Sequence, residues 1–485
     1  MATNGGTQKP FRVAIVGGGI GGLFATLCIH HHCKDYPIEI DVYEQASEFK
    51  EIGAGVGMGI NAARLIHKIG IGEQLNNVAG KRDGVWITFR RFDNGEDIVT
   101  IPVDDTKTIR QAPVARSDLL DLYRHTIEER KAATLHTKKQ CKRVEDNGDS
   151  VTIHFSDSTT ATADLVVACD GIKSNIRNQF VQDKPIYSGT IAYRGTIPIS
   201  QLKSWPFNTY SVAWCGKHKH MLVFPITNNK VLNIVAFVTA PESEVEDVVE
   251  SWTTVCDRKD IEEDFRGFED TVQQVISLMP ERPGKWRLND RAPLDQWHYF
   301  DGKVMLLGDA AHASTLSDYK SWNTFLLRHS GIALTLNVHS APHLGAGAGQ
   351  AMEDGWVLGR TLGEFLQSHS SAPSDPNQFT TLQACSEHYQ AVRLPRAQKV
   401  QRTSRIAGNT YEMQTEDMLD KSYDECVPLM AERTRTRMKF VWEEDLDVAY
   451  DNVRAGLSPA PLWDHRREAR ANGRAERSNH CQVDY

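Results

Sequence analysis

The stretch FRVAIVGGGIGGLFATLCIHHHCKDYPIEIDVYE, from Phe11 to Glu44, decides the fold class. Phe11–Val16 is a short apolar run rich in β-branched residues, which is typical of a buried parallel strand. A glycine turn follows, then a helix-compatible segment, Leu23–His32, and a second alternating strand, Glu39–Tyr43. A strand, a helix and a parallel strand in this order predict a βαβ unit, and therefore an α/β fold with a doubly wound sheet.

The glycines of this turn have the spacing of a dinucleotide-binding turn. Gly17, Gly19 and Gly22 satisfy GxGxxG, in which the glycines allow a tight turn, a close approach of a pyrophosphate and close packing of helix on strand. The start of the next helix offers unpaired N–H groups to phosphates. Glu44 closes the second strand, where a carboxylate can accept both hydroxyls of an adenosine ribose. The alternative is a glycine turn without a ligand. No second glycine fingerprint of this kind occurs in the chain.

Composition limits the class of protein. With 485 residues, the chain is long enough for two or three packed units. A net charge of -8 gives no reason to expect a nucleic-acid partner. The nine cysteines lack close CxxC pairs, so we expect reduced thiols, no metal site and a cytoplasmic protein. No apolar run reaches the roughly 18 residues that a membrane span requires.

Further motifs lie far along the chain. Asp170, in LVVACDGIKSNIR, and Asp309, after KVMLLG, each follow a short buried strand, where a carboxylate can lie beside a dinucleotide. Arg116 begins a helix-like segment, and the loop LGAGAG around Ala346 and Ala348 offers backbone N–H donors in front of another helix. The alternatives are an acidic turn at each aspartate and a surface ion pair at the arginine.

Together these motifs resemble the single-component, FAD-dependent aromatic hydroxylases, which include the salicylate-hydroxylase-like and p-hydroxybenzoate-hydroxylase-like monooxygenases. The resemblance is carried by GGGIGG with Glu44, the DGxxSxxR run at Asp170, the GD pair ending at Asp309, and the helix start GAGAGQAMED. It spans roughly residues 11–408. It implies a Rossmann-like FAD-binding domain, an antiparallel-sheet substrate domain and C-terminal helices. The implied FAD-binding residues are Glu44, Gly57, Arg116, Asp309, Ala346 and Ala348.

The resemblance also implies an activity. NAD(P)H, bound without its own Rossmann domain, would reduce FAD, and a flavin hydroperoxide formed with dioxygen would hydroxylate an electron-rich phenolic ring. Arg194, in AYRGTIP, matches a position where similar fungal enzymes place an arginine beside the substrate, although a sheet-edge ion pair is the alternative. Two other functions stay open: an epoxidase or dearomatase that acts on another substrate, and a flavoprotein whose catalysis is impaired.

The reason for impairment is an interruption of the last motif. In the resembled family the proline–glycine loop follows GDAAH after a few residues, whereas here Pro342 lies 30 positions beyond His312. Removing the 26 residues Thr315–Ser340 restores GDAAHASAPHLGAGAGQAMED. We hypothesise that this segment is translated intervening sequence or a gene-model error; a genuine insertion is the alternative.

These patterns divide the chain as follows. We expect an FAD-binding domain over residues 1–180 and 285–365, with residues 84–102 contributing to the substrate sheet, and a substrate domain over 181–284. We expect a C-terminal helical region over 366–462, a disordered tail over 463–485 and the anomalous insertion over 315–340.

Overall fold

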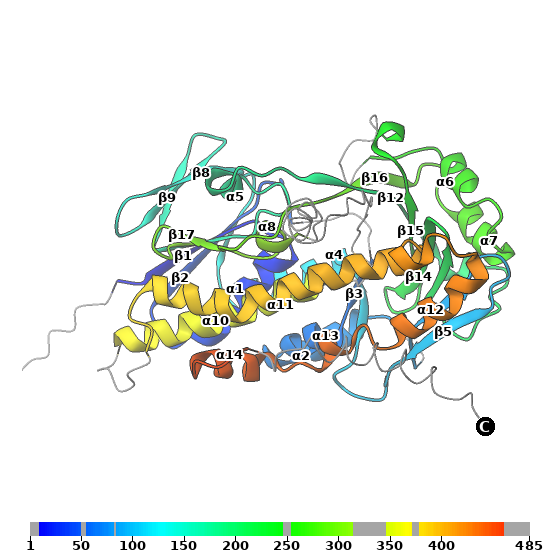
Figure 1. Cartoon of the computed structure of the whole chain (residues 1–485). Helices are drawn as coiled ribbons and strands as arrows, with labels where there is room; N and C mark the ends of the chain where they lie inside the picture. The colour runs from blue at the N-terminus through cyan, green and yellow to red at the C-terminus, as the bar shows by residue number, and fades with distance from the viewer. Residues whose placement is uncertain are drawn as a thin grey trace, which may run out of the picture.

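The computed structural model describes residues 9–49, 55–81, 84–245, 254–313, 346–370 and 378–459. A six-stranded sheet has the order β17-β18-β11-β1-β2-β7 and is parallel except for its edge strand β17 (Figure 1). Its strands are β1 (Phe11–Val16), β2 (Ile38–Tyr43), β7 (Thr134–His136), β11 (Leu165–Ala168), β17 (His298–Tyr299) and β18 (Val304–Leu306). This sheet confirms the predicted α/β class.

Helix α1 (Ile20–Cys33) connects β1 to β2 and is buried on most of its surface. It packs against the long helix α10 (Gly347–Ser370). At Gly355, Gly359 and Gly363 a Cβ atom would lie within 2.9 Å of α1 atoms, so the two helix backbones approach closely there. The apolar character of α1 therefore reflects burial between the sheet and α10.

The second large sheet has seven strands, in the order β16-β12-β15-β14-β13-β4-β5. Its strands are β4 (Val85–Arg91), β5 (Asp97–Pro102), β12 (Ile186–Pro198), β13 (Val212–Gly216), β14 (Lys219–Ile226), β15 (Val231–Thr239) and β16 (Gly284–Asp290). All neighbouring pairs are antiparallel except β4 with β13. One face packs against α6 (Arg258–Asp264) and α7 (Asp270–Leu278), and the other faces the C-terminal helices (Figure 1).

Two expected boundaries differ from the structure. The FAD-binding part was expected to resume at residue 285, but β16 pairs with β12 in the seven-stranded sheet, so the chain rejoins the six-stranded sheet only at β17. The boundary at 365/366 falls inside α10, which continues to Ser370. Both differences arise because pairing and helix packing, rather than local composition, end these elements. The division into two domains otherwise stays a prediction.

The C-terminal region is helical. It contains α11 (Leu382–Tyr411), α12 (Tyr423–Arg435), α13 (Lys439–Glu443) and α14 (Leu446–Arg454). Helix α11 runs along the molecule from β17, at the edge of the six-stranded sheet, to α12, which packs beside the seven-stranded sheet (Figure 1). The expected insertion, 315–340, and the expected tail, 463–485, lie outside the described residues.

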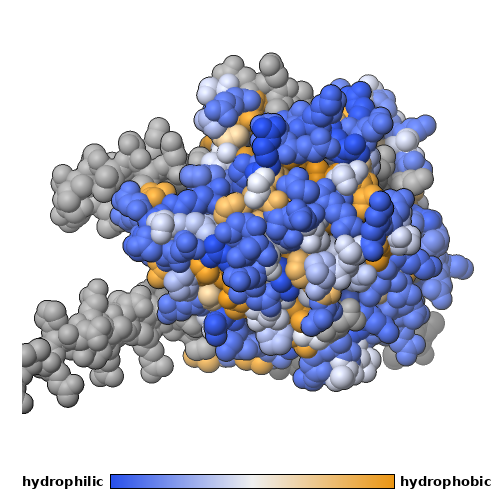
Figure 2. All heavy atoms as spheres, turned by 90° about the vertical axis from the view of Figure 1, so that its right-hand side faces the viewer, coloured by the Kyte–Doolittle hydropathy of each residue, from blue (hydrophilic) through white to orange (hydrophobic). Residues whose placement is uncertain are grey.

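The remaining helices and smaller sheets lie along the chain between the strands of the two large sheets. They are α2 (Ile60–Lys68), α3 (Gly72–Val78), α4 (Arg116–Arg130), α5 (Asn175–Phe180), α8 (Asp309–His312), a pair of strands β3 (Gly55–Met58) and β6 (Ala112–Ala115), and a small sheet of β8 (Cys141–Asp146), β9 (Val151–Phe155) and β10 (Thr160–Ala163). Hydrophilic residues cover most of the face in Figure 2, with small hydrophobic areas between them. Within the described ranges, no helix combines the length and apolarity of a membrane span.

Candidate cofactor and substrate site

Four predicted cofactor positions lie at one edge of the parallel sheet. Gly17 follows β1, Glu44 follows β2, Asp170 lies just after β11, and Asp309 begins α8 just after β18. Because these strands are parallel, their carboxyl ends meet at the same edge. In α/β folds this edge is where dinucleotides bind. The fold thus brings together residues that are almost 300 positions apart in the sequence.

The glycine turn leaves open space at the start of α1. Gly17 has φ +109°, and a Cβ atom there would lie 2.2 Å from the carbonyl oxygen of Cys169. A Cβ atom on Gly22 would lie 2.0 Å from the carbonyl oxygen of Gly17. Around Gly19, which caps α1 without a side-chain hydrogen bond, no atom lies within 4 Å of the added Cβ position. Two glycines are therefore required by packing, while the third borders space that suits a pyrophosphate.

Glu44 is anchored beside this turn. Its Oε2 accepts a hydrogen bond from the Gly18 backbone N–H at 2.7 Å, and its Oε1 accepts one from Ala46 at 2.8 Å. Each carboxylate oxygen has a second lone pair, so both oxygens keep the capacity to accept a ribose hydroxyl.

Asp170 carries a buried oxygen without a partner. Its Oδ2 accepts from the Ile176 backbone N–H at 3.3 Å, whereas Oδ1 has no hydrogen-bond partner in the described part of the chain. Burial raises the pKa of this carboxyl, and hydrogen bonds from Ser174 and nearby backbone only partly offset that effect. An unpaired buried acceptor fits a ligand that brings hydroxyl or N–H groups to this edge.

A buried arginine holds α8, the short helix that starts at Asp309, through hydrogen bonds to its backbone. Arg177, on α5, is fully buried and donates to the carbonyl oxygens of Ala310 at 3.2 Å and Ala311 at 3.4 Å. It also pairs with Asp183 at 2.6 Å. Asp309 itself is exposed, so its carboxylate faces outward from a rigid support.

On the other side of α8, Asp354 of α10 accepts three hydrogen bonds. Its Oδ2 accepts from the Gly308 backbone N–H at 3.0 Å and lies 2.5 Å from His312 Nε2, and its Oδ1 accepts from Arg393 Nε at 2.8 Å. Burial raises the pKa of this carboxyl, but the charges of His312 and Arg393 outweigh it and lower the pKa to about 2. Asp354 therefore stays ionised at neutral pH.

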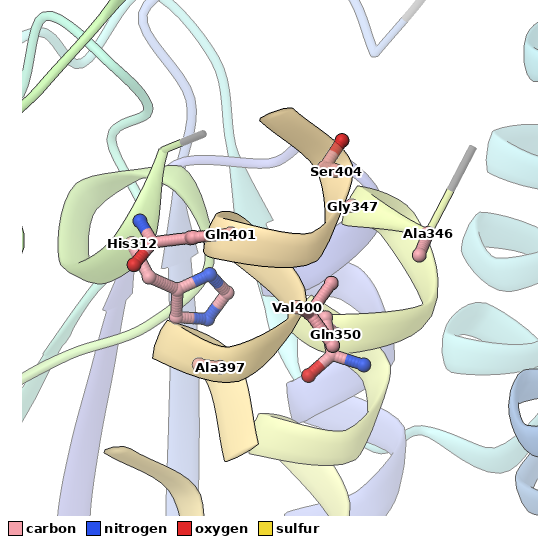
Figure 3. Close-up of a pocket in the computed structure, with 8 residues that line it drawn as sticks. All are labelled: His312, Ala346, Gly347, Gln350, Ala397, Val400, Gln401 and Ser404. Atoms are coloured by element: carbon pink, nitrogen blue, oxygen red, sulfur yellow. The ribbon is translucent and has the colours of Figure 1, made fainter. Parts of the chain in front are cut away.

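A pocket lies where α8, the start of α10 and α11 meet (Figure 3). Its lining residues are His312, Ala346, Gly347, Gln350, Ala397, Val400, Gln401 and Ser404. Gln350 Nε2 and Gln401 Oε1 have no hydrogen-bond partner among the described residues, although both side chains are buried. Ala346 and Ala348 lie at the amino end of α10, where unpaired N–H groups favour an oxygen of a ligand. This end suits the polar edge of a flavin ring.

Gly57 and the segment that leads into Arg116 belong to the same pair of strands, β3 and β6. Gly57 lies opposite Pro113 in the β3–β6 pair, and Arg116 is the first residue of α4, directly after β6. Their assembly depends on two segments that are almost 60 residues apart in sequence.

Arg194 lies on the face of the seven-stranded sheet that meets β3. It is opposite Val235 in the ladder, and its guanidinium lies 5.1 Å from the centre of the Trp286 ring. On the same face, Asn233 Oδ1 accepts from the Gly55 backbone N–H at 2.8 Å. Since β3 also carries Gly57, Arg194 lies on the sheet face that contacts the strand bearing this predicted cofactor position.

Sequence reasoning missed the residues that hold this site together. Asn233, Glu353, Asp354, Arg393 and Arg396 make buried contacts between elements. The sequence held a signal for the charged residues: Arg393 and Arg396 lie within one helical turn, and Glu353 and Asp354 are adjacent. Such charges are costly to bury unless they pair with opposite charges.

The chain is similar to known flavin-dependent hydroxylases in sequence and in structure. The family described as FAD binding domain matches residues 11–324. A salicylate hydroxylase from Pseudomonas putida is 30% identical, over 94% of this chain and 96% of that protein. A 6-methylsalicylate 1-monooxygenase from Aspergillus terreus is 29% identical, over 90% of each chain. A solved salicylate hydroxylase substrate complex superimposes with a TM-score of 0.71 at 27% identity, covering 93% of this chain and 99% of that one.

Proposed function

The chain belongs to the family of single-component, FAD-dependent aromatic hydroxylases, and we propose that it uses NAD(P)H and dioxygen to hydroxylate an electron-rich, phenolic small molecule. FAD is its cofactor. The observation that carries the proposal is the position of β3, which bears Gly57: this strand contacts α10, which bears Ala348, and donates a hydrogen bond from the Gly55 N–H to Asn233 on the sheet face that bears Arg194.

Different residues of the chain would bind different parts of FAD. Gly17, Gly19 and Gly22 admit the pyrophosphate at the start of α1, and Glu44 holds the adenosine ribose. Asp170 and Asp309 bind along the middle of the cofactor, and Gly57, Arg116, Ala346 and Ala348 border the flavin ring. The chemistry that bound FAD supplies is acceptance of hydride from NAD(P)H and transfer of one oxygen atom from dioxygen to the ring.

Arg194 positions the substrate. A phenolate or carboxylate on the ring would accept hydrogen bonds from the guanidinium, which also favours the ionised, electron-rich form of a phenol. Trp286, whose ring lies beside this guanidinium, limits its motion.

The test is oxidation of NADPH and NADH by the purified full chain against a panel of phenols and salicylates, with products identified by mass and NMR. We expect yellow protein, substrate-stimulated consumption of the nicotinamide and a product heavier by one oxygen on the ring. An epoxide or a dearomatised product would show that the chain catalyses another flavin-dependent oxygenation and not ring hydroxylation. Yellow protein that consumes no nicotinamide with any substrate would contradict the proposal.

Substitution Arg194→Met tests the substrate role. We expect KM for the best substrate to rise by about 10- to 100-fold, since a hydrogen bond to a charged group contributes roughly 1.5–3 kcal/mol, while FAD affinity stays the same. The measurement is steady-state kinetics with flavin titration.

Arg287→Met is the matched control. Arg287 lies on β16 of the same sheet and also contacts an aromatic ring, at 4.4 Å from the centre of Tyr187, but its ladder position faces the α6–α7 side. Equal increases in KM for both variants would show that either substitution disturbs the whole sheet. Arg194 would then have no specific role in binding the substrate.

A further inference from the structure

We propose that Arg393 is a clamp that holds the two halves of the FAD cradle together across the interrupted motif, so that FAD affinity does not depend on the chain between them. The two halves are the turn at Gly308–Asp309 and the amino end of α10 at Ala346–Ala348. Ala313 and Ala346 are 33 positions apart in sequence. The inference rests on the proposed FAD-binding roles of both halves.

Arg393 is fully buried on α11 and uses all of its guanidinium nitrogens on α10. Its Nη2 donates to Gln350 at both the backbone oxygen, 3.2 Å, and Oε1, 2.8 Å. Its Nη1 donates to Glu353 Oε2 at 2.7 Å, and its Nε donates to Asp354 Oδ1 at 2.8 Å. A single side chain therefore fixes the first turns of α10, directly behind Ala346–Ala348.

Asp354 extends the clamp to the other half of the cradle. Its second oxygen receives the Gly308 N–H and lies 2.5 Å from His312 Nε2. Gly308 has φ +64°, and this turn sets the direction in which Asp309 leaves β18. The path Gln350–Arg393–Asp354–Gly308 thus connects both halves through side chains, without using the backbone of residues 314–345.

This connection explains how an interrupted motif can keep its geometry. The entropy cost of closing a loop grows only with the logarithm of its length, so a long connection adds little to that cost. What a long connection removes is the restraint that a short loop places on its two ends. Buried charge-assisted hydrogen bonds with fixed directions can supply that restraint instead.

Arg396 provides a matched comparison. It is buried on the same helix three residues later and pairs with Glu353 at 2.6 Å, but its other contacts go to Glu444 and to backbone oxygens of α13. It contacts neither Gln350 nor Asp354. Its loss removes a buried cation from α11 and leaves both halves of the cradle connected.

The experiment compares the full chain with a chain that lacks residues 315–340, each carrying Arg393→Met, Arg393→Lys, Arg396→Met or no substitution. FAD dissociation constants are measured on apoprotein by flavin fluorescence, and thermal unfolding is measured without FAD. In the full chain we expect Arg393→Met to weaken FAD binding by about tenfold more than in the shortened chain, a coupling of the size found for contacting groups. Arg396→Met lowers the unfolding temperature in both chains without this difference.

Arg393→Lys keeps the charge but lacks the planar fork, so it should fold if Arg393→Met does not, and should show the same dependence on chain length to a smaller degree. Equal loss of FAD affinity in both chains, for either Arg393 variant, would overturn the clamp. It would leave the proposed FAD-dependent function standing. Failure of every unsubstituted chain to bind FAD would overturn the proposed function and the clamp together.

Discussion

Gly19→Ala is expected to weaken FAD binding by up to about 100-fold while leaving the apoprotein folded. The added Cβ meets no protein atom within 4 Å, and the backbone at this position, φ -75° and ψ -174°, is open to any residue. The methyl group instead occupies the space that a pyrophosphate needs at the start of α1. Overpacking of this kind costs about 1–3 kcal/mol, and at the upper end of that range FAD affinity falls by about 100-fold.

The measurement is FAD titration of apoprotein, paired with thermal unfolding with and without FAD. Without FAD, we expect the variant to unfold within about 1 kcal/mol of the parent, the size of a change at a helix cap. Gly19→Ser is the control, because serine is a better cap for α1 yet carries the same Cβ atom. If Gly19→Ser restored FAD affinity, the loss would come from the helix cap and the pyrophosphate would lie elsewhere.

Asp354→Asn is expected to destabilise the protein at neutral pH by about 3–5 kcal/mol, since it removes the buried carboxylate that pairs with both His312 and Arg393 and leaves Arg393 with Glu353 alone. The folded-state pKa of Asp354, about 2, lies below the ordinary value of 3.8. Its ionised form therefore stabilises the fold fully above about pH 4, and this contribution is lost as the pH falls toward 2.

The difference between parent and variant should thus shrink as the pH falls from about 4 toward 2. Urea unfolding at several pH values measures this difference, and subtraction cancels the other carboxylates. Asp309→Asn is the control, because Asp309 is exposed and its loss should change stability by about 0.5 kcal/mol or less. A difference that persisted unchanged down to pH 2 would show that the charge of Asp354 does not stabilise the fold.

Local sequence patterns were sufficient for the fold class and the cofactor class. The βαβ unit from Phe11 to Glu44 is encoded by residues close together in sequence, and the structure confirms β1, α1 and β2 there. The short runs ending near Asp170 and Asp309 likewise return to the parallel sheet as β11 and β18. Such elements can be predicted because periodicity and turn chemistry act over a few residues.

The sequence was less informative about which sheet each strand joins and where the domains end. Residues 284–290 alternate like any half-buried strand, and only pairing with β12 assigns them to the seven-stranded sheet. The same holds for β4, whose parallel partner β13 lies more than 100 residues away. A strand's pattern states which residues are buried, but it does not identify the neighbouring strand.

The sequence alone determined that this protein has a parallel α/β core with a glycine turn for a dinucleotide, because those features depend on neighbours along the chain. Tertiary structure alone decided that Arg393 and Asp354 connect α11 and α10 to the Gly308 turn, and that Arg194 shares a sheet face with Asn233, which contacts β3. The physical reason is that a buried charge requires a partner without specifying it. Only the packing of α8, α10 and α11 determines which carboxylate each arginine meets.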